Sequence, residues 1–233
     1  MTGTLYGVGV GPGDPELLTL KAHRLIISAP VLAYPVNSEG NGFAQQIVGN
    51  FIQPESVHLP IAIPMKTERS PAQCAYDSAA EKISVHLESG RDVVFLCEGD
   101  PFFFGSFMYL FERLNGAHTC KVVPGVTSLT ACAAELGRPL AARNDVLKVL
   151  PAPLDAETLT LELQSAQSAA IIKVGRHFEK VRAVLQDLEL SEKAWIVEAA
   201  TNPHQTIRAL NDVPHGERPY FSTILIYRGD EPW

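Results

Sequence analysis

The sequence predicts an α/β protein of two domains, with a mainly parallel sheet in the first domain and a mixed sheet in the second. Three observations support this fold class. Short apolar runs alternate with stretches of helical periodicity from residue 5 to residue 136, which is the pattern of parallel β-α-β units. One run, residues 91–97, is almost continuously apolar, as in a strand covered on both faces. After Gly137-Arg138-Pro139 the strands follow one another with less helix between them, which favours a mixed sheet.

The first domain, residues 1–126, is expected to hold five strands and four helices. The strand over residues 31–34 should stop at Pro35, because proline donates no backbone hydrogen bond. Asp14 and Thr19 can both cap the first helix, and Pro15 suits its first turn. The expected strands are 5–10, 31–34, 56–61, 91–97 and 119–123, and the expected helices are 17–28, 43–51, 71–88 and 105–114.

The second domain, residues 127–233, begins with a predicted helix over residues 127–136. Further helical periodicity covers residues 155–165 and 178–188. Four segments read as strands, and residues 206–210 are a candidate for a fifth. The four strands are 145–150, 169–174, 194–199 and 220–227.

Composition excludes several classes of protein. Of the 233 residues 46% are hydrophobic and 19% are charged, so the chain can bury a sizeable core. A net charge of −7 speaks against nucleic acid and against anionic lipid, which both need a basic surface. The four cysteines form no CxxC pair, so we expect no metal site, and Cys97 and Cys132 lie in apolar surroundings typical of buried thiols. We expect a cytoplasmic protein without a signal peptide or membrane span.

Glycine-bearing turns follow three of the predicted strands. Gly13-Asp14-Pro15 follows the first strand, and Gly99-Asp100-Pro101 follows the strand over residues 91–97. The segment Val122-Val123-Pro124-Gly125-Val126-Thr127-Ser128 has the same strand-then-turn form. Because ligands in open α/β sheets bind outside the carboxyl ends of the strands, these turns predict one backbone-lined crevice for a small molecule.

The glycines do not match the common phosphate-binding loops. A GxGxxG motif that started at Gly7 would need glycine at Pro12, and one that started at Gly9 would need it at Asp14. No GxxxxGK[ST] sequence occurs. The glycines can also be explained as tight turns with positive φ, although this does not account for the recurrence of Gly-Asp-Pro.

The segment from Cys97 to Ser106 carries the sharpest chemical signal. Gly99 would let a ligand approach the main chain, and Asp100 can accept a hydrogen bond from a ligand or from nearby backbone N–H groups. For an aspartate in a turn the backbone role is favoured. The run Phe102-Phe103-Phe104 cannot face one core, so at least one ring should line a pocket or an interface.

Three segments, in order and spacing, resemble the tetrapyrrole methylase family, whose members transfer methyl groups from S-adenosylmethionine. The segments are Gly9-Val10-Gly11-Pro12-Gly13-Asp14-Pro15-Glu16-Leu17-Leu18-Thr19, Gly99-Asp100-Pro101-Phe102-Phe103-Phe104-Gly105-Ser106 and Val123-Pro124-Gly125-Val126-Thr127-Ser128. Finer details are similar to the branch that methylates precorrin-2 at C20 to give precorrin-3A in cobalamin (vitamin B12) biosynthesis. These details are Leu32-Ala33-Tyr34-Pro35-Val36, Pro60-Ile61-Ala62-Ile63-Pro64-Met65, Glu98 before Gly99, and Ile172-Lys173-Val174-Gly175-Arg176-His177.

The resemblance implies two α/β domains with the cofactor in a cleft between them, and a homodimer. It places the amino acid and sulfonium end of S-adenosylmethionine against Glu98, Gly99, Asp100 and Phe103, with Thr127 and Ser128 continuing that wall. Val174, Ala199 and Ala200 would contact the adenosine, and Pro12 would lie where substrate meets cofactor. Many members carry a glycine near Ala199-Ala200, which this chain lacks.

The chemistry requires positioning more than activation, because the methyl group already carries a good leaving group. A tetrapyrrole bears many carboxylates, so basic residues should surround it. Asp14, Tyr34, Lys173 and Arg176 are the expected substrate contacts, and further basic candidates are Lys66, Arg69, Arg113 and Arg143. A proton must also leave the methylated carbon, and no base is assigned among the candidates His58, Asp14, Glu98, His177 and Glu198.

Other functions remain open from the sequence. The metal-containing analogue cobalt-factor II is an alternative substrate. Another member of the fold, such as a uroporphyrinogen methylase, a diphthine synthase or an rRNA ribose methylase, is a second alternative. A non-catalytic module that senses S-adenosylmethionine is an alternative of a different class, although Gly99 and Asp100 are intact.

Overall fold

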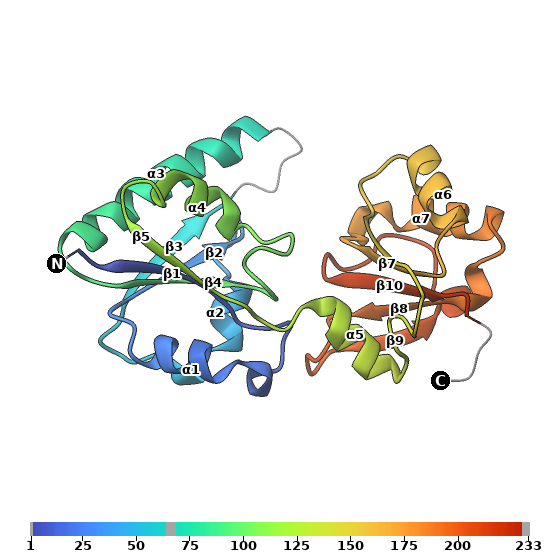
Figure 1. Cartoon of the computed structure of the whole chain (residues 1–233), viewed down its shortest axis with the longest axis horizontal. Helices are drawn as coiled ribbons and strands as arrows, with labels where there is room; N and C mark the ends of the chain where they lie inside the picture. Colours follow the sequence, from blue (N-terminus) through green and yellow to red (C-terminus); the bar gives the residue numbers. More distant parts are fainter. Residues whose placement is uncertain (1, 64–68, 230–233) are drawn as a thin grey trace. The chain divides into compact units, whose positions relative to one another are not determined.

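The computed structural model describes residues 2–63 and 69–229, which divide into two compact α/β units. The division falls between Thr127 and Ser128 (Figure 1). The first unit contains a parallel sheet and the second a mixed sheet, so the predicted fold class is confirmed. None of the helices in the described ranges combines the length and apolar character that a membrane crossing requires.

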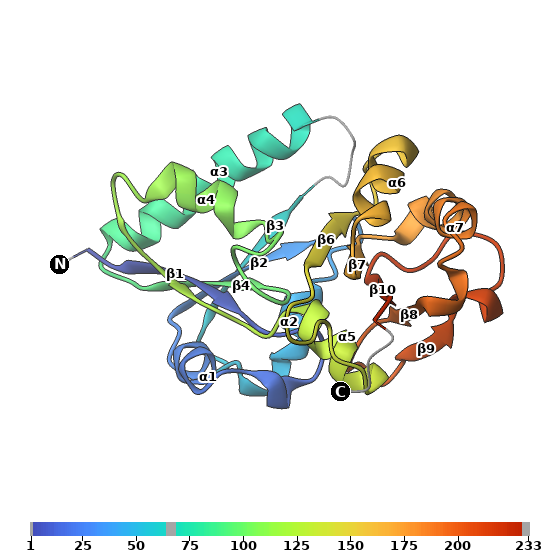
Figure 2. The same cartoon turned by 45° about the vertical axis from the view of Figure 1, so that its right-hand side comes forward.

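The sheet of the first unit has five parallel strands in the order β3-β2-β4-β1-β5. The strands are β1 (Thr4–Gly9), β2 (Val31–Val36), β3 (Val57–Ala62), β4 (Val93–Cys97) and β5 (Thr119–Val123). The helices are α1 (Leu20–Ile27), α2 (Phe43–Ile47), α3 (Arg69–Glu88) and α4 (Phe107–Leu114). Helices α1 and α2 cover one face of the sheet, and α3 and α4 cover the other (Figures 1 and 2).

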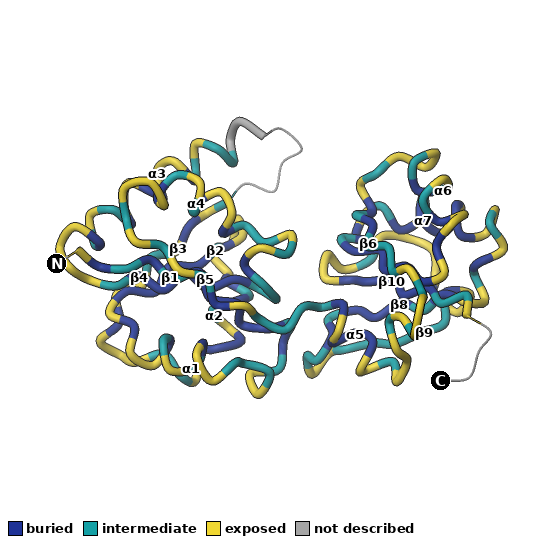
Figure 3. Tube along the Cα trace, in the orientation of Figure 1, coloured by how far each residue is buried: buried dark blue, intermediate teal, exposed yellow. Residues whose placement is uncertain are grey.

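The β4 strand explains why residues 91–97 read as a continuous apolar run. Every residue of β4 is buried, and successive side chains enter opposite cores. Val93 and Phe95 join the cluster under α3 and α4, whereas Val94 and Leu96 join the cluster under α1 and α2. Buried positions accordingly concentrate along β1, β2 and β4, whereas the outer strands β3 and β5 and the outward faces of the helices are more exposed (Figure 3).

Both predicted caps near the first helix are used, but they cap different elements. The Asp14 carboxylate accepts a hydrogen bond from the Glu16 N–H at 2.8 Å and begins a short 3₁₀ turn, Pro15–Leu17. The Thr19 hydroxyl accepts from the Ala22 N–H at 3.1 Å and begins α1. The single helix predicted over residues 17–28 is therefore wrong in its first turn, because two capping side chains divide the segment.

The prediction that β2 stops at Pro35 is also wrong, since the strand continues to Val36. The Ile63 N–H donates to the Val36 carbonyl, so Val36 faces β3. Residues in a strand alternate in the side to which their backbone groups point, so Pro35 faces β4. Pairing between β2 and β4 ends at Ala33, and no donor is needed from Pro35.

The sheet of the second unit has the order β6-β7-β10-β8-β9, with β6 and β7 parallel and the other neighbours antiparallel. Its strands are β6 (Leu147–Pro151), β7 (Ser168–Ile172), β8 (Ala194–Glu198), β9 (Thr206–Ala209) and β10 (Ser222–Tyr227). Its α-helices are α5 (Ser128–Leu136), α6 (Ala156–Gln164) and α7 (Phe178–Asp187), and the 3₁₀ turn η5 (Leu210–Asp212) follows β9. The core cluster combines the sheet with α6 and α7, and the candidate strand over residues 206–210 is present as β9.

Most other predicted boundaries agree with the structure within two residues. The helix over residues 43–51 is the exception, because α2 ends at Ile47 and a 3₁₀ turn over Gly49–Phe51 follows. Glycine is a poor helix former, which accounts for the early end. Cys97 and Cys132 are buried free thiols, as predicted.

Candidate functional site

Main-chain atoms join the carboxyl ends of β1 and β4, which are neighbours in the first sheet. Beyond the strands, Gly11 and Gly99 form an isolated antiparallel bridge. The Gly99 N–H donates to the Gly11 carbonyl at 2.9 Å, and the Gly11 N–H donates to the Gly99 carbonyl at 3.4 Å. Two of the glycine turns predicted to meet are therefore in direct contact.

The third glycine turn, after β5, packs against the same two. A Cβ atom on Gly125 would lie 2.1 Å from the Gly99 carbonyl oxygen, and one on Gly9 would lie 2.5 Å from the same oxygen. Both distances are far below van der Waals contact, so only glycine fits at these positions. Gly99 itself has φ +63°, a conformation that favours glycine. The carboxyl ends of β4, β1 and β5 thus form a single edge of bare main chain, which we call the glycine edge (Gly9, Gly11, Gly99, Gly125).

The Asp100 carboxylate links parts of the glycine edge by accepting hydrogen bonds from backbone N–H groups. One carboxylate oxygen accepts from the Phe102 and Phe103 N–H groups at 2.9 and 3.0 Å. The other oxygen accepts from the Gly125 N–H at 3.1 Å, which ties the turn after β4 to the turn after β5. Of the two roles that the sequence left open, these contacts support the turn-stabilising one.

Glu98, immediately before Gly99, is placed differently. Its carboxylate is partly buried and accepts a hydrogen bond from the Ala44 N–H at 3.3 Å. Burial raises the pKa of the Glu98 carboxyl, and its hydrogen bonds offset only part of that effect. Glu98 is therefore a carboxyl group at the glycine edge that holds its proton more firmly than an exposed glutamate.

The three phenylalanines after Asp100 do not all face one core, as predicted. Phe102 and Phe104 are exposed at 48% and 41%, and Phe103 is partly buried, with its ring 5.2 Å from that of Phe104. Phe102 also packs edge-on against Phe111 of α4, at 5.2 Å between ring centroids. Two large apolar rings are thus presented to solvent beside the glycine edge.

Of the remaining predicted residues of the first unit, Pro12 and Thr127 lie beside this edge. Pro12 is partly buried directly after Gly11, and Thr127 lies close enough that a Cβ on Gly99 would be 3.9 Å from its Cα. Asp14 uses a carboxylate oxygen as a cap. Tyr34 is buried in β2, and its hydroxyl contacts the His58 Nδ1 at 3.0 Å on β3, the outermost strand. The Nδ1 atom of His58 is therefore engaged by the Tyr34 hydroxyl. Burial raises the pKa of Tyr34.

Most of the predicted residues of the second unit lie at one edge of its sheet. Strands β7 and β8 run parallel to each other on either side of β10. After β7, the Val174 N–H donates to the Ser222 carbonyl at 3.4 Å, and after β8, the Ala199 N–H donates to the Phe221 carbonyl at 2.8 Å. Val174 and Ala200 are buried. We call the ends of β7 and β8, with the start of β10 between them, the second edge. Ser128 is the first residue of α5.

Three residues of the second edge that are not glycine adopt left-handed backbone conformations. The φ angles are +58° at Lys173, +48° at Ala199 and +63° at Thr201. Such conformations cost free energy in L-residues and concentrate at functional sites. The angle at Ala199 also explains why glycine suits this part of the chain. Burial lowers the pKa of the half-buried Lys173, and Arg176 is exposed.

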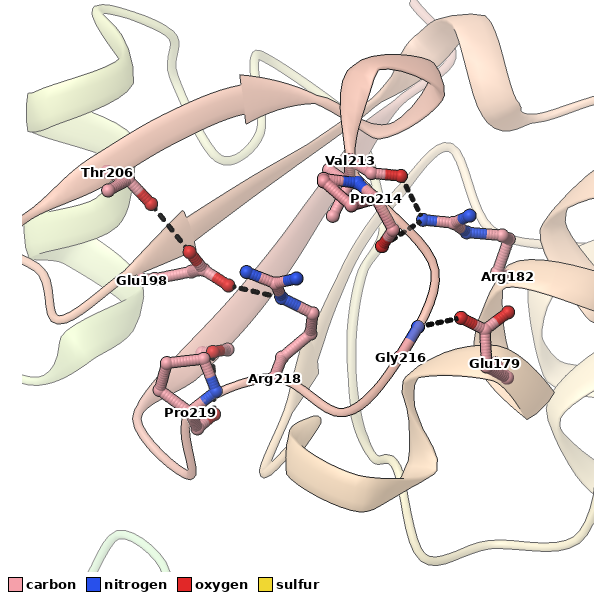
Figure 4. Close-up of polar contacts among 10 residues, drawn as sticks. Glu179, Arg182, Glu198, Thr206, Val213, Pro214, Gly216, Arg218 and Pro219 are labelled. Carbon is pink, nitrogen blue, oxygen red and sulfur yellow. Dashed lines mark hydrogen bonds and ion pairs between the residues drawn. The ribbon is translucent and has the colours of Figure 1, made fainter.

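Sequence reasoning missed Arg218, which forms an ion pair with Glu198 beneath the second edge (Figure 4). The Arg218 Nε donates to one Glu198 oxygen at 2.6 Å, and the Thr206 hydroxyl donates to the other at 2.6 Å. Burial would raise the Glu198 pKa, but these hydrogen bonds and the nearby arginine charges outweigh it, so the pKa is lowered. Glu198 is a poor candidate for the base, because its carboxylate is fully engaged.

The structure also gives positions for several of the other candidate basic and proton-transfer groups. Arg113 donates to Asp77 at 2.7 Å between α4 and α3, where it joins two helices. Burial lowers the pKa of His177, which follows the second edge. Lys66 and the Arg69 side chain lie outside the described residues. Arg143 adopts a left-handed conformation with φ +46° in the segment before β6.

Comparisons with known proteins give a matching family model and several similar relatives. The family model described as "Tetrapyrrole (Corrin/Porphyrin) Methylases" matches residues 4–211. The cobalamin biosynthesis protein CobIJ of Mycobacterium tuberculosis H37Rv is 39% identical over 97% of this chain, which spans about half (46%) of that relative's length. Precorrin-2 C(20)-methyltransferase of a Sinorhizobium species is 38% identical, over 96% of this chain and 95% of the relative. Cobalt-precorrin-2 C(20)-methyltransferase of Salmonella typhimurium is 31% identical, over 97% of both chains.

Solved structures share the two-unit fold. Cobalt precorrin-4 methyltransferase CbiF superposes with a TM-score of 0.77 at 24% identity, over 96% of this chain and 94% of that one. Uroporphyrin-III C-methyl transferase from Thermus thermophilus, complexed with S-adenyl homocysteine, has a TM-score of 0.70 at 26% identity, over 96% and 97%. With the family model covering most of the sequence, the chain belongs to the tetrapyrrole methylase family.

Proposed function

We propose that this chain transfers a methyl group from S-adenosylmethionine to C20 of precorrin-2, giving precorrin-3A in cobalamin biosynthesis. The observation that carries this proposal is the 38% identity to the Sinorhizobium precorrin-2 C(20)-methyltransferase over nearly the full length of both chains. Matching over the whole length favours the same substrate more strongly than a match to the cofactor loops alone would.

Cobalt-factor II is the second candidate substrate. The 31% identity to the Salmonella cobalt-precorrin-2 C(20)-methyltransferase over 97% of both chains favours it specifically. The higher identity to the Sinorhizobium enzyme leads us to rank the metal-free substrate first.

The residues present fit S-adenosylmethionine, whose sulfonium supplies an activated methyl group. We propose that Glu98, Gly99, Asp100 and Phe103 contact its amino acid end, with Pro12, Thr127 and Ser128, and that Val174, Ala199 and Ala200 contact its adenosine. Gly99 supports this assignment, because the nearest atoms to a Cβ there would be 3.8 Å away and leave its main chain approachable. Glu98 supports it as well, because a partly buried carboxyl group can accept hydrogen bonds from an ammonium group. The Thermus relative complexed with S-adenyl homocysteine supports the cofactor class.

The proposal is tested by incubating the protein with S-adenosylmethionine and either precorrin-2 or cobalt-factor II, followed by mass spectrometry. We expect the mass of one added methyl group on precorrin-2, formed faster than on the cobalt compound. Faster methylation of the cobalt compound would support the second candidate. Binding of S-adenosylhomocysteine with no methyl transfer to either tetrapyrrole would support a non-catalytic sensor instead.

We also propose that the chain forms a homodimer. Large apolar side chains are exposed on and beside α4, and burying them against a second copy would remove them from water. They are Phe102, Phe104, Met108 and Tyr109. Light scattering coupled to size-exclusion chromatography should give twice the chain mass, and a monomer mass at micromolar concentration would contradict the dimer.

A further inference from the structure

The segment between η5 and β10, residues 213–221, is hydrogen-bonded to the chain after both strand ends of the second edge. The Arg218 N–H donates to the Gly175 carbonyl after β7 at 3.2 Å. The Phe221 carbonyl accepts from the Ala199 N–H after β8 at 2.8 Å. Any displacement of this segment would therefore move the main chain that we assign to the adenosine site.

The first half of the segment is held by side chains of α7 (Figure 4). Arg182 is buried and donates to the Val213 and Pro214 carbonyls. Glu179 accepts from the Gly216 N–H at 2.7 Å. These contacts fix the start of the segment, at a distance in sequence from the residues that border β7 and β8.

The second half depends on the Glu198–Arg218 ion pair. The Glu198 side chain is 6% exposed and that of Arg218 is 15% exposed, so both charges are largely removed from water. Thr206 completes the hydrogen bonds of the carboxylate. From Arg218 the chain turns directly into β10, and the Ser222 hydroxyl closes the turn by donating to the Pro219 carbonyl at 2.6 Å.

A largely buried ion pair contributes little net stability compared with apolar groups of the same size, but it fixes geometry and is costly to break on one side only. Here the fixed geometry extends to Tyr220 and Phe221, which are exposed at 47% and 42% with their rings edge to face at 5.2 Å. The ion pair therefore holds in place the residues that bear two aromatic side chains at the second edge. A planar base binds well against such surfaces when they are preorganised.

We propose that Glu198 and Arg218 are positioning residues for cofactor binding: their ion pair holds residues 218–221 in the geometry that receives the adenosine of S-adenosylmethionine. This inference rests on the proposed function, because it assigns the second edge to that cofactor. Neither side chain needs to touch the ligand for the pair to act.

The test measures binding of S-adenosylhomocysteine by isothermal titration calorimetry, together with the thermal unfolding midpoint. Arg218→Met leaves the Glu198 charge buried without its partner, so it should lower the unfolding midpoint and raise the Kd by about tenfold or more. The double variant Glu198→Gln/Arg218→Met removes both charges and should recover most of the midpoint. We expect its Kd to remain raised by about fivefold or more, because the segment is no longer fixed.

The matched control is Glu162→Gln, which breaks the Lys148–Glu162 pair at 2.7 Å between β6 and α6, away from the second edge. Its Kd should equal that of the wild type. A double variant that binds S-adenosylhomocysteine as tightly as the wild type would overturn the inference and leave the ion pair a purely structural one. A wild-type protein that does not bind this ligand would instead contradict the proposed cofactor, so the two failures are distinguishable.

Discussion

The two edges achieve a fixed main chain by different means. At the glycine edge the chain packs backbone to backbone through Gly9, Gly99 and Gly125, and the Asp100 carboxylate links the turns after β4 and β5. The second edge keeps side chains, holds Ala199 in a left-handed conformation, and ties the adjoining segment with a largely buried ion pair. The comparison shows two ways to make a strand end rigid: close approach of backbone, or an ion pair that holds the adjoining segment. Substitutions at the two edges should therefore affect stability differently.

The largest effect is expected from Gly125→Ala. The new Cβ would lie 2.1 Å from the Gly99 carbonyl oxygen, which is backbone and cannot swing away. We expect a loss of about 3 kcal/mol or more in the free energy of unfolding, measured by urea denaturation. Gly116→Ala is the control, because nothing lies within 4 Å of its Cβ position, and its effect should stay within about 0.5 kcal/mol. Equal effects for both variants would show that close approach is not what fixes this edge.

Asp100→Ala should have the next largest effect. It removes the acceptor of three backbone N–H groups, on Phe102, Phe103 and Gly125. We expect a loss of about 2 kcal/mol in the free energy of unfolding and weaker binding of S-adenosylhomocysteine. Asp100→Asn keeps one carbonyl oxygen and should lose about half as much. Weaker binding with unchanged stability would mean that the carboxylate meets the ligand and does not hold the turn.

Ala199→Gly should act in the opposite direction. Glycine relieves the strain of φ +48°, so the free energy of unfolding should rise by about 1 kcal/mol. Ala200→Gly is a neighbouring control without a positive φ, and it should be destabilising because glycine gains more freedom in the unfolded chain. Chemical denaturation of both variants measures the difference, and destabilisation by Ala199→Gly would refute strain at the second edge.

The smallest expected effect is a difference in pH dependence. The pKa of Glu198 is lowered below its ordinary value of 4.5, so its stabilising contribution is present above that value and is lost as the pH falls through the lower folded-state pKa. Between about pH 6 and about pH 3, the wild type should therefore lose more unfolding free energy than Glu198→Gln/Arg218→Met. Parallel curves for the two proteins would show that the ion pair is not coupled to folding.

Much of the fold and of the glycine edge could be predicted from the sequence, because the signals are local. The apolar run of β4 and the capping residues Asp14 and Thr19 are readable within a few positions. Convergence of the glycine turns follows once the strands are parallel and adjacent. The error at Pro35 arose because its tolerance depends on where the pairing of β2 with β4 ends, and that point is set by a strand far along the chain.

The second edge was predicted less completely, for the same physical reason. Val174 and Ala199 could be placed at strand ends, but the left-handed conformation of Ala199 leaves no mark on an alanine. Arg218 lies 20 residues from Glu198 in a segment without periodicity, so it reads as an ordinary surface arginine. Only the antiparallel arrangement of β8 and β10 brings the two together.

The position of β1 also has a consequence for synthesis. This strand is synthesised before the other strands of the first unit, yet both of its neighbours, β4 and β5, come last in that unit. A nascent chain that stops before Val93 can pair β2 with β3 but offers no strand next to β1. The apolar strand β1 therefore has no neighbour until β4 has been made, and it lacks its second neighbour until residue 123 has been added. It is the segment of this unit most in need of protection from premature association.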